Sequence, residues 1–470
     1  MSIFKALAAL VFIEGYVVLA SELIAIRNLI SYVGNGTDII SIIIAGVLLP
    51  LAFGYYRGGH LAIHGLIRKR LIRNFTIAMV FLVLALSIIS IDAFFFALAQ
   101  FGIFNRLLSA CLYVIILLCP PLYLLGQTLP LLMRLLRVKH SSGAAGKMLF
   151  WSTLGSFLGS VLSTLVLMAF WGVHGAALVV ILLLLCGLVI LKRKISFRTM
   201  AVPGLVMLVM LAMNSGLVFS GYGVYYANAY NTVRILNKAD GKLLMLNNAP
   251  SSYYKKSTDE VAEYITKAEE IFLKPLETVT DPKNILVLGS GGFTFGRNDK
   301  KNNFTYVDID PDLKKVTEDY FLGKKLSANQ TFIAKAARAF LIEAIQKNQS
   351  YDLVYIDLYN GEFWPPEDLV TQDFYEQVRK VTKPDGLIGA NFVASPNYSN
   401  DLTLSLDETF RSVFPVVNRI PIQQYNPWEQ HEKYFMNILY VAYNKPLSEH
   451  GVIYTDQRNR IMWDKPKTPF

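Results

Sequence analysis

The sequence predicts a chain in two parts: an α-helical membrane domain with seven spans, and a C-terminal α/β domain that begins with a β-hairpin subdomain. Of the 470 residues, 53% are hydrophobic, and the long uncharged runs are concentrated before residue 221. After residue 221 the composition becomes polar and β-branched, and short apolar runs end in glycine turns or acidic residues. We therefore expect a membrane domain at 1–221, a β-hairpin and linking helix at 222–275, and the α/β domain with a C-terminal tail at 276–470.

The membrane domain is predicted from segment length. A run of about 20 apolar residues is long enough to cross the roughly 30 Å of hydrocarbon in a bilayer. Seven such runs are expected near 6–30, 38–56, 75–98, 108–132, 148–170, 174–191 and 200–220.

The loops between these segments differ in charge. Thirteen Lys and Arg residues lie in the loops after the second, fourth and sixth segments, whereas the other loops contain only Arg106. Because basic loops remain in the cytoplasm, we expect a multi-pass protein of the cell (plasma or inner) membrane with a cytoplasmic N-terminus. After seven spans the C-terminal domain would be extracytoplasmic; if the segment at 200–220 does not cross, that domain returns to the cytoplasm.

Charge and cysteine content exclude two classes of function. Residues 1–221 carry a formal charge of +12 and the remainder −2, so the basic character belongs to the membrane half. A nucleic-acid-binding domain needs a basic face, and none is evident in the C-terminal half. All three cysteines (Cys111, Cys119 and Cys186) lie in apolar segments, so we predict no disulfide framework, no zinc spacing and no metal.

The ionisable residues Glu22, Arg27 and Asp92 fall within the apolar segments. An ionisable group at membrane depth is a functional-site hypothesis by default. The alternative is that Arg27 extends to the membrane surface, while Glu22 and Asp92 belong to a hydrogen-bonded cluster. The sequence leaves both interpretations open.

The chemistry of the chain is concentrated in residues 283–311. An apolar run at 285–288 breaks into the glycine turn Gly289-Ser290-Gly291-Gly292, and a second run at 304–307 ends on Asp308. Strand, glycine turn and a second strand with an acidic tip are the first half of a nucleotide-binding unit, in which the acidic side chain accepts the hydroxyls of a ribose. The spacing G-x-G-x-x-G is not completed, because Thr294 stands in the third glycine position. This favours an adenosyl-sulfonium ligand over a dinucleotide.

Other elements complete the predicted domain. Residues 351–356 form an apolar strand that delivers Asp357 to its carboxyl end, where ligands bind in open α/β sheets. Further elements are expected as a hairpin of 232–236 with 242–246, a helix at 259–271, a helix that begins at 373, and strands at 387–391 and 435–442.

Residues 228–445 resemble the spermidine synthases, which are aminopropyltransferases. The resemblance rests on Tyr230 in an N-terminal strand, the glycine turn, the sequence VDIDP at 307–311, ARAFL at 337–341 and YDLVYID at 351–357. It implies a Rossmann-like fold of the class I methyltransferase type. The apolar half more loosely resembles the seven-span region that is fused to some bacterial homologues of this family.

The resemblance also implies roles for single residues. Asp357 aligns with the family's catalytic carboxylate, which holds the amine and accepts its proton. Asp308 aligns with the residue that binds the ribose, next to Gly289, Ser290 and Gly291 of the turn. Four further positions follow from the same alignment: Ala336 at the adenine, and Tyr230, Asn231 and Asn360 in the amine pocket, with Asn360 three residues beyond the catalytic one.

The chain departs from the family at several of these places. Acidic residues of the family are replaced by Gly292, Ala336 and Asn360, and the Gln after the pocket tyrosine is Asn231. The leading prediction is a membrane-anchored aminopropyltransferase that moves propylamine from decarboxylated S-adenosylmethionine to an amine such as putrescine. Methyl transfer from S-adenosylmethionine to a membrane-proximal acceptor stays open, as does a non-catalytic module that binds a polyamine or nucleoside. The expected partners are a small-molecule amine and the lipid bilayer, and homo-oligomerisation is left open.

Overall fold

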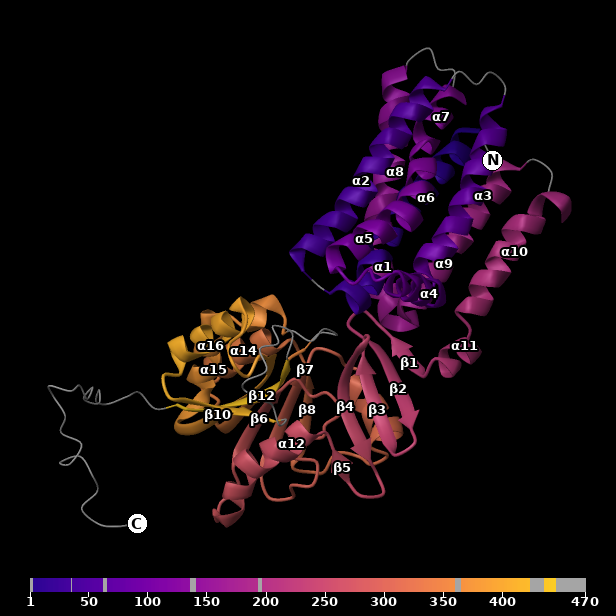
Figure 1. Cartoon of the computed structure of the whole chain (residues 1–470). Coiled ribbons are helices and arrows are strands. Elements are labelled where there is room, and N and C mark those ends of the chain that lie inside the picture. Colours follow the sequence, from indigo (N-terminus) through magenta and orange to yellow (C-terminus); the bar gives the residue numbers. More distant parts are fainter. Residues whose placement is uncertain are drawn as a thin grey trace, which may run out of the picture.

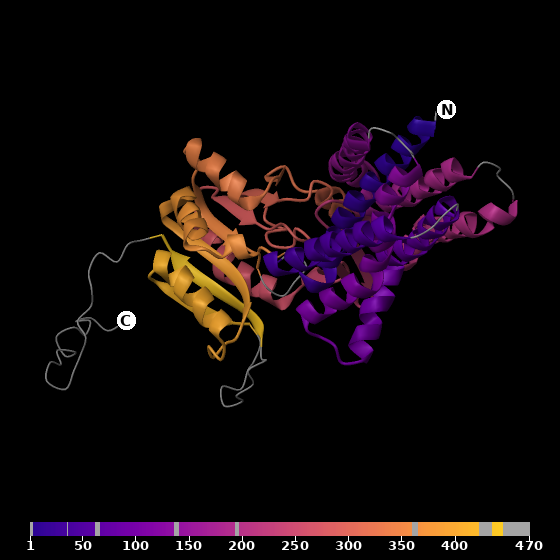
Figure 2. The same cartoon turned by 90° about the horizontal axis from the view of Figure 1, so that it is seen from above.

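Figure 1 shows the computed structural model, in which a helical bundle lies above an α/β domain and a smaller antiparallel sheet beside it. The structure describes residues 3–34, 36–61, 66–135, 141–192, 197–359, 365–422 and 435–444. Seen from above, in Figure 2, the bundle and the α/β domain lie side by side.

The bundle contains the apolar half of the chain. Its first helices are α1 (Ile3–Val33), α2 (Thr37–His60), α3 (Ile67–Leu86), α4 (Ile88–Gln100) and α5 (Arg106–Tyr113). They are followed by η1 (Val114–Leu118), α6 (Cys119–Gly126), α7 (Thr128–Leu135), α8 (Ser141–Leu162), η2 (Ser163–Met168), α9 (Ala169–Leu191), α10 (Phe197–Met213) and α11 (Gly216–Gly221).

Helices α1 and α8 pack with their backbones in close contact. A Cβ atom added at Gly155 would lie 2.1 Å from the carbonyl oxygen of Phe12, and one at Gly159 would lie 2.4 Å from that of Tyr16. Any side chain at these two positions would therefore push the helices apart. Small residues spaced four apart are the usual means of close packing between apolar helices.

The seven predicted membrane spans are not confirmed as seven separate helices. Among the residues that the structure describes, five helices are long and apolar enough to cross a membrane, or six if the bent pair α3 and α4 counts as one span. The span predicted at 75–98 is not one straight helix, because the chain breaks at Ser87 and α4 turns away from α3 by 70°. The spans predicted at 148–170 and 174–191 belong to one run, Gly143–Leu191, which is interrupted at Gly172 by a non-helical conformation (φ 74°, ψ 175°).

The smaller sheet is more extensive than the predicted hairpin. Its antiparallel strands follow in chain order: β1 (Val224–Ala227), β2 (Thr232–Lys238), β3 (Gly241–Leu246), β4 (Ala249–Lys255) and β5 (Glu260–Val261). The hairpin of β2 and β3 is confirmed. The helix predicted from residue 259 begins instead at Glu263 with α12 (Glu263–Ala268), followed by η3 (Glu269–Leu273) and η4 (Lys274–Thr278). Asp259 cannot start it, because its positive φ of 53° is incompatible with a helix and Glu260 pairs with β4.

The larger sheet has the order β11-β12-β10-β9-β6-β7-β8. Its strands are β6 (Asn284–Leu288), β7 (Asn303–Asp308), β8 (Gln330–Ala334), β9 (Tyr351–Ile356), β10 (Thr382–Ala394), β11 (Val417–Pro421) and β12 (Met436–Tyr443). Strands β8, β7, β6, β9 and β10 run parallel, whereas β12 and β11 are antiparallel to their neighbours. The predicted strands at 285–288, 304–307, 351–356 and 435–442 are thus confirmed to within one residue at each end. The strand predicted at 387–391 is also confirmed, but β10 begins five residues earlier and ends three residues later.

Both faces of the parallel sheet are covered. Leu286 and Leu288 of β6 pack against α14 (Ala337–Gln346), α15 (Gln372–Val381) and α16 (Asp401–Val413). The alternate residues Ile285 and Val287 face α12, α13 (Leu313–Val316), η5 (Thr317–Phe321) and the smaller sheet. Burial on both faces explains why these strands read as continuous apolar runs. Strand β6 lies between β7, the next strand along the chain, and β9, which follows later in the sequence. The strand order therefore reverses at β6, and ligands of α/β sheets bind at the carboxyl ends of the strands where the order reverses.

The bundle meets the α/β half at the C-terminal end of α1. The Arg27 Nε donates to the carbonyl oxygen of Asn228 (2.8 Å), and Asp92 of α4 forms a salt bridge with Arg234 of β2 (3.3 Å). Of the two interpretations left open, the contacts favour the second for these residues: Arg27 reaches the end of the bundle, and Asp92 belongs to a hydrogen-bonded cluster with Tyr32 and Arg234. The 70° turn into α4 is what brings Asp92 to this junction.

Candidate active site

A cavity of about 660 Å³ lies at the carboxyl ends of β6, β7 and β9, bounded by β3, β4 and the start of α12. The structure brings to it every predicted site residue that it describes: Gly289, Ser290, Gly291, Asp308, Ala336, Tyr230, Asn231 and Asp357. Asn360 lies outside the described residues. Residues that are far apart in the sequence meet here because parallel strands end at the same edge of a sheet.

The glycine turn sits at the centre of the cavity wall. Gly289 has a φ of 89°, and a Cβ atom at this position would lie 2.0 Å from the carbonyl oxygen of Asp357. Its amide donates to the carbonyl of Val307 at 2.9 Å, while the Asp357 amide donates to the carbonyl of Leu288 at 2.8 Å. The turn is thus fixed to both neighbouring strands, and only glycine fits at position 289.

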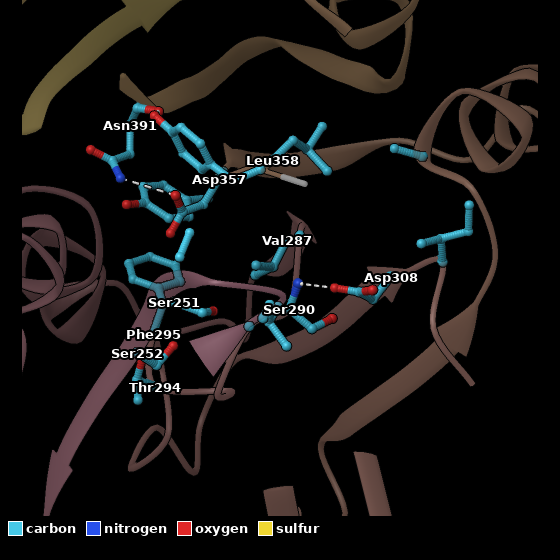
Figure 3. A pocket seen from close by; sticks show the side chains of 18 of the residues that line it. Ser251, Ser252, Val287, Ser290, Thr294, Phe295, Asp308, Asp357, Leu358 and Asn391 are labelled. Carbon is cyan, nitrogen blue, oxygen red and sulfur yellow. Dashed lines mark hydrogen bonds between the residues drawn. The ribbon is translucent and has the colours of Figure 1, made fainter. Parts of the chain in front are cut away.

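Asp308 lies at the tip of β7, on one side of this turn. Its carboxylate accepts hydrogen bonds from the amides of Ser290 (3.0 Å) and Asp310 (3.1 Å). Burial raises the pKa of Asp308 to about 6, although the backbone hydrogen bonds oppose this shift. Figure 3 shows Ser290 and Asp308 joined across the turn. A carboxylate with lone pairs left over at the cavity wall can accept two adjacent hydroxyl groups.

Asp357 lies on the other side of the turn, just beyond β9. Its carboxylate accepts from Nδ2 of Asn391 (3.0 Å) and from the hydroxyl of Tyr264 (3.1 Å). Burial raises the pKa of Asp357 to about 6, while both hydrogen bonds lower it. At neutral pH the group is therefore ionised, and it is a stronger base than an exposed aspartate.

Tyr264 and Asn391 were not predicted as site residues. Asn391 stands in the predicted strand 387–391, next to β9, so the rule that parallel strands present their carboxyl ends to the ligand could have identified it. Tyr264 belongs to α12, and nothing in its local sequence indicates that it reaches a residue 93 positions further along the chain.

Gly292 replaces an acidic residue of the family, and the structure closes this position. A Cβ atom there would lie 2.5 Å from the ring of Phe321 and 2.8 Å from Cβ of Ser252. The Gly292 amide donates to Oγ of Ser252 at 2.9 Å. Figure 3 shows that hydroxyl-bearing residues gather in this part of the cavity: Ser251, Ser252, Ser290 and Thr294.

Tyr230 and Asn231 differ from expectation in detail. Tyr230 lies in the turn between β1 and β2, not in a strand, and 42% of its surface is exposed. Asn231 is buried, and its amide group donates to Asp310 (2.9 Å) and accepts from Asn247 (3.2 Å). Its side chain therefore holds the surrounding loops together. Ala336 lies directly before α14, where its methyl group offers no hydrogen bond to a ligand.

Across the residues that the structure describes, no three His, Cys, Asp or Glu side chains are grouped so that they could hold a metal ion.

The comparisons with known proteins concern this part of the chain. Residues 265–428 match the family model of the spermine/spermidine synthase domain, in agreement with the resemblance seen in the motifs. The polyamine aminopropyltransferase of Vibrio vulnificus is 30% identical over 138 residues, covering 28% of this chain and 44% of that protein. The enzyme of the same name from Prochlorococcus marinus is 24% identical over 202 residues, covering 40% and 66%.

The chain thus spans about half to two thirds of the length of these curated relatives. Among solved structures, a probable spermidine synthase from Corynebacterium glutamicum aligns with a TM-score of 0.38 at 19% identity, covering 46% of this chain and 78% of the other. The spermidine synthase from Thermotoga maritima aligns with a TM-score of 0.35 at 16% identity, covering 46% and 70%.

Proposed function

We propose that this protein is a membrane-anchored aminopropyltransferase, which moves propylamine from decarboxylated S-adenosylmethionine to an amine such as putrescine. The observation that carries the proposal is the pair Asp308 and Asp357, which face one cavity from opposite sides of a glycine turn. This cavity belongs to a spermine/spermidine synthase-type domain. Relatives that share this domain are named polyamine aminopropyltransferases.

The nucleoside would bind on the Asp308 side. The carboxylate would accept the two ribose hydroxyls, and the open backbone at Gly289 and Gly291 would let the sulfonium part approach β6. Ser290 Oγ is buried and has no hydrogen-bond partner among the described residues, so it is available to the ligand. With Ala336 in place of an acidic residue, the adenine would depend on shape and on backbone groups.

The amine would bind on the Asp357 side. The carboxylate of Asp357 would hold the ammonium form of the acceptor and take one proton from it. The neutral nitrogen then attacks the propyl carbon next to the sulfur, so that a C–N bond forms and the C–S bond breaks. The electron pair of the broken bond returns to sulfur, which becomes a neutral thioether, and the product amine carries the positive charge.

The membrane half would anchor this domain with seven passes. A straight helix of the 49 residues from Gly143 to Leu191 would be about 74 Å long, more than twice the hydrocarbon thickness. The break at Gly172 supports two passes in this run, and the bent pair α3 and α4 would supply one. We propose a cytoplasmic N-terminus and an extracytoplasmic α/β domain, from the charge of the loops.

The test uses the full chain in lipid nanodiscs with decarboxylated S-adenosylmethionine and putrescine. Mass spectrometry should detect spermidine and methylthioadenosine in equal amounts. Binding of the adenosyl compound without transfer to any diamine or monoamine would contradict the proposal.

Methyl transfer is the second candidate, because position 292 has no room for a carboxylate that could hold the primary ammonium group of a decarboxylated donor. It predicts S-adenosylhomocysteine as the product when the same preparation receives S-adenosylmethionine.

A further inference from the structure

The junction between the bundle and the α/β half lies beside the candidate active site. Ile30 of α1 lines the same cavity as Asp308 and Asp357. Ser31, the next residue of α1, donates from its hydroxyl to Oδ1 of Asn247 in the turn after β3 (3.2 Å). A helix of the apolar bundle thus forms part of the wall of a site whose other residues all come from the α/β half.

Arg27 is the charged residue of α1 at this junction. Only 4% of it is exposed, and its Nε donates to the carbonyl oxygen of Asn228 at 2.8 Å. Its Nη2 atom is buried and has no hydrogen-bond partner among the residues that the structure describes. A buried cation with an unpaired donor is a poor way to stabilise a fold, because an apolar side chain of similar size usually does as well or better.

Asn228 connects Arg27 to the turn between β1 and β2. Its Oδ1 accepts from the amides of Tyr230 and Asn231, both at 2.9 Å. Its Nδ2 donates to Asp310 (2.8 Å) and Asp312 (3.0 Å). One side chain therefore fixes both the turn that carries Tyr230 and the loop that follows Asp308.

Asp310 completes the connection to Asp308. It is fully buried and accepts from the side chains of Tyr226 (2.8 Å), Asn228 (2.8 Å) and Asn231 (2.9 Å). Its own amide donates to the carboxylate of Asp308 at 3.1 Å. Arg27 is also within electrostatic range of Asp310. A continuous path of hydrogen bonds thus runs from α1 through Asn228 and Asp310 to Asp308.

We propose that Arg27 is a positioning residue, through which the membrane bundle holds the Asp308 loop in the geometry that binds the adenosyl co-substrate. This inference rests on the proposed function, because it assigns the Asp308 side of the cavity to the nucleoside. Arg27 touches neither ligand and takes no part in the transfer. Its loss should weaken nucleoside binding and leave turnover at saturating co-substrate almost unchanged.

Two other contacts at the junction do not bond directly to this loop, and the Ser31 contact reaches Asp310 only through Asn247 and Asn231. Asp92 pairs with Arg234 of β2, and Ser31 bonds to Asn247. Both attach the bundle to the smaller sheet, and neither bonds to the loop at 309–312. These two contacts should keep the bundle attached to the smaller sheet when Arg27 is lost. A loss of nucleoside affinity in an Arg27 variant would therefore indicate a positioning role and not a loss of attachment.

The test compares the full-length wild type with Arg27→Met and Arg27→Lys in nanodiscs. Calorimetry measures the Kd for methylthioadenosine, and steady-state assays measure KM for decarboxylated S-adenosylmethionine and kcat. Arg27→Met should raise both Kd and KM about tenfold, the scale for losing a hydrogen bond from a charged group, with kcat changed less than twofold. Arg27→Lys keeps the cation and a donor, so it should recover most of the affinity.

The matched control is Arg106→Met. Arg106 also belongs to the bundle, but its guanidinium pairs with Asp38 of α2 in an exposed salt bridge (2.7 Å), and we expect wild-type Kd and kcat. Asn228→Ala interrupts the same path from the α/β side and should weaken binding similarly. Combined with Arg27→Met, it should add little further loss. If Arg27→Met does not fold, the Kd of Asn228→Ala for methylthioadenosine tests the proposal in its place.

Unchanged nucleoside affinity in Arg27→Met and Asn228→Ala would overturn the proposal. So would a fall in kcat with unaltered KM. If the wild type itself binds neither nucleoside, the proposed function fails, and this outcome is distinct from a wild type that binds and variants that bind equally well.

Discussion

At the scale of single residues, burial controls the acidity of the two aspartates of the cavity and raises the pKa of both Asp308 and Asp357 to about 6. A base must be deprotonated to accept a proton, so the rate should fall as the pH decreases through about 6. Tyr264→Phe removes a hydrogen bond that lowers the pKa of Asp357. The acid limb of the kcat profile should therefore move to higher pH in this variant, and a shift to lower pH would contradict the assignment of Asp357 as the base.

Asp357→Asn tests the base itself. The substitution keeps size and one hydrogen-bond acceptor but removes charge and basicity. Turnover should fall by about 10²–10⁴-fold, the usual range for a positioned acid–base group, while nucleoside binding changes little. The control is Asp352→Asn at the opposite end of β9, where the carboxylate pairs with Lys383 at 2.9 Å. Full transfer activity in Asp357→Asn would make this residue a structural one.

Asp308→Ala tests nucleoside recognition. Loss of a charged hydrogen-bond partner weakens binding by roughly 1.5–3 kcal/mol, so the Kd for methylthioadenosine should rise by at least tenfold. Asp319→Ala, which removes an exposed ion pair with Lys325, should bind normally. Equal affinities of Asp308→Ala and wild type would exclude Asp308 from the nucleoside site.

At the scale of elements, the sequence predicted best those that are buried on both faces. Strands β6, β7 and β9 are mostly apolar, and a glycine or an aspartate stands at or directly after their carboxyl ends. Their type and their functional ends can therefore be predicted without tertiary information. The α3–α4 bend and the late start of α12 were missed. Ser87 is an ordinary residue inside an apolar run, and the strand pairing of Glu260 depends on a partner elsewhere in the chain.

Because α1 packs closely on α8, we expect two glycine-to-alanine substitutions in α8 to change the stability in opposite directions. Alanine is favoured over glycine in a helix by about 0.5–1 kcal/mol, and Gly146→Ala in α8 meets nothing within 4 Å. Gly155→Ala would instead force its Cβ against the backbone of Phe12, and overpacking costs about 1–3 kcal/mol. Thermal unfolding in detergent should show Gly146→Ala at or above the wild-type Tm and Gly155→Ala clearly below it. Equal Tm values would show that the two helices separate at little cost.

At the scale of the whole molecule, the division into an apolar half and an α/β half was predictable from composition, but their connection was not. The path from Arg27 to Asp310 begins with a hydrogen bond between Arg27 and Asn228, which are 201 positions apart in the sequence. Two of its members, Asn228 and Asp310, lie in loops, where a sequence presents them as ordinary loop residues. Polar networks of this kind depend on the final geometry, so neither periodicity nor a motif reveals them.

The arrangement of the whole molecule also predicts on which side of the membrane the α/β domain lies. Arg68 donates to the carbonyl of Leu191, and Arg134 to the carbonyls of Gly59 and Leu61, so the basic ends of α2, α3, α7 and α9 lie together. Arg27 and Asp92 meet the smaller sheet at the other end of the bundle. Because basic ends stay in the cytoplasm, the α/β domain should lie outside it.

Reporter fusions measure this directly. Fusions near residues 65, 140 and 195 should report a cytoplasmic location, and a fusion after residue 225 an extracytoplasmic one. Adenosyl compounds are made in the cytoplasm, so an external domain would need them delivered across the membrane. A cytoplasmic signal after residue 225 would mean that the last apolar segment does not cross, which would reduce the number of passes to six and give the site direct access to its co-substrate.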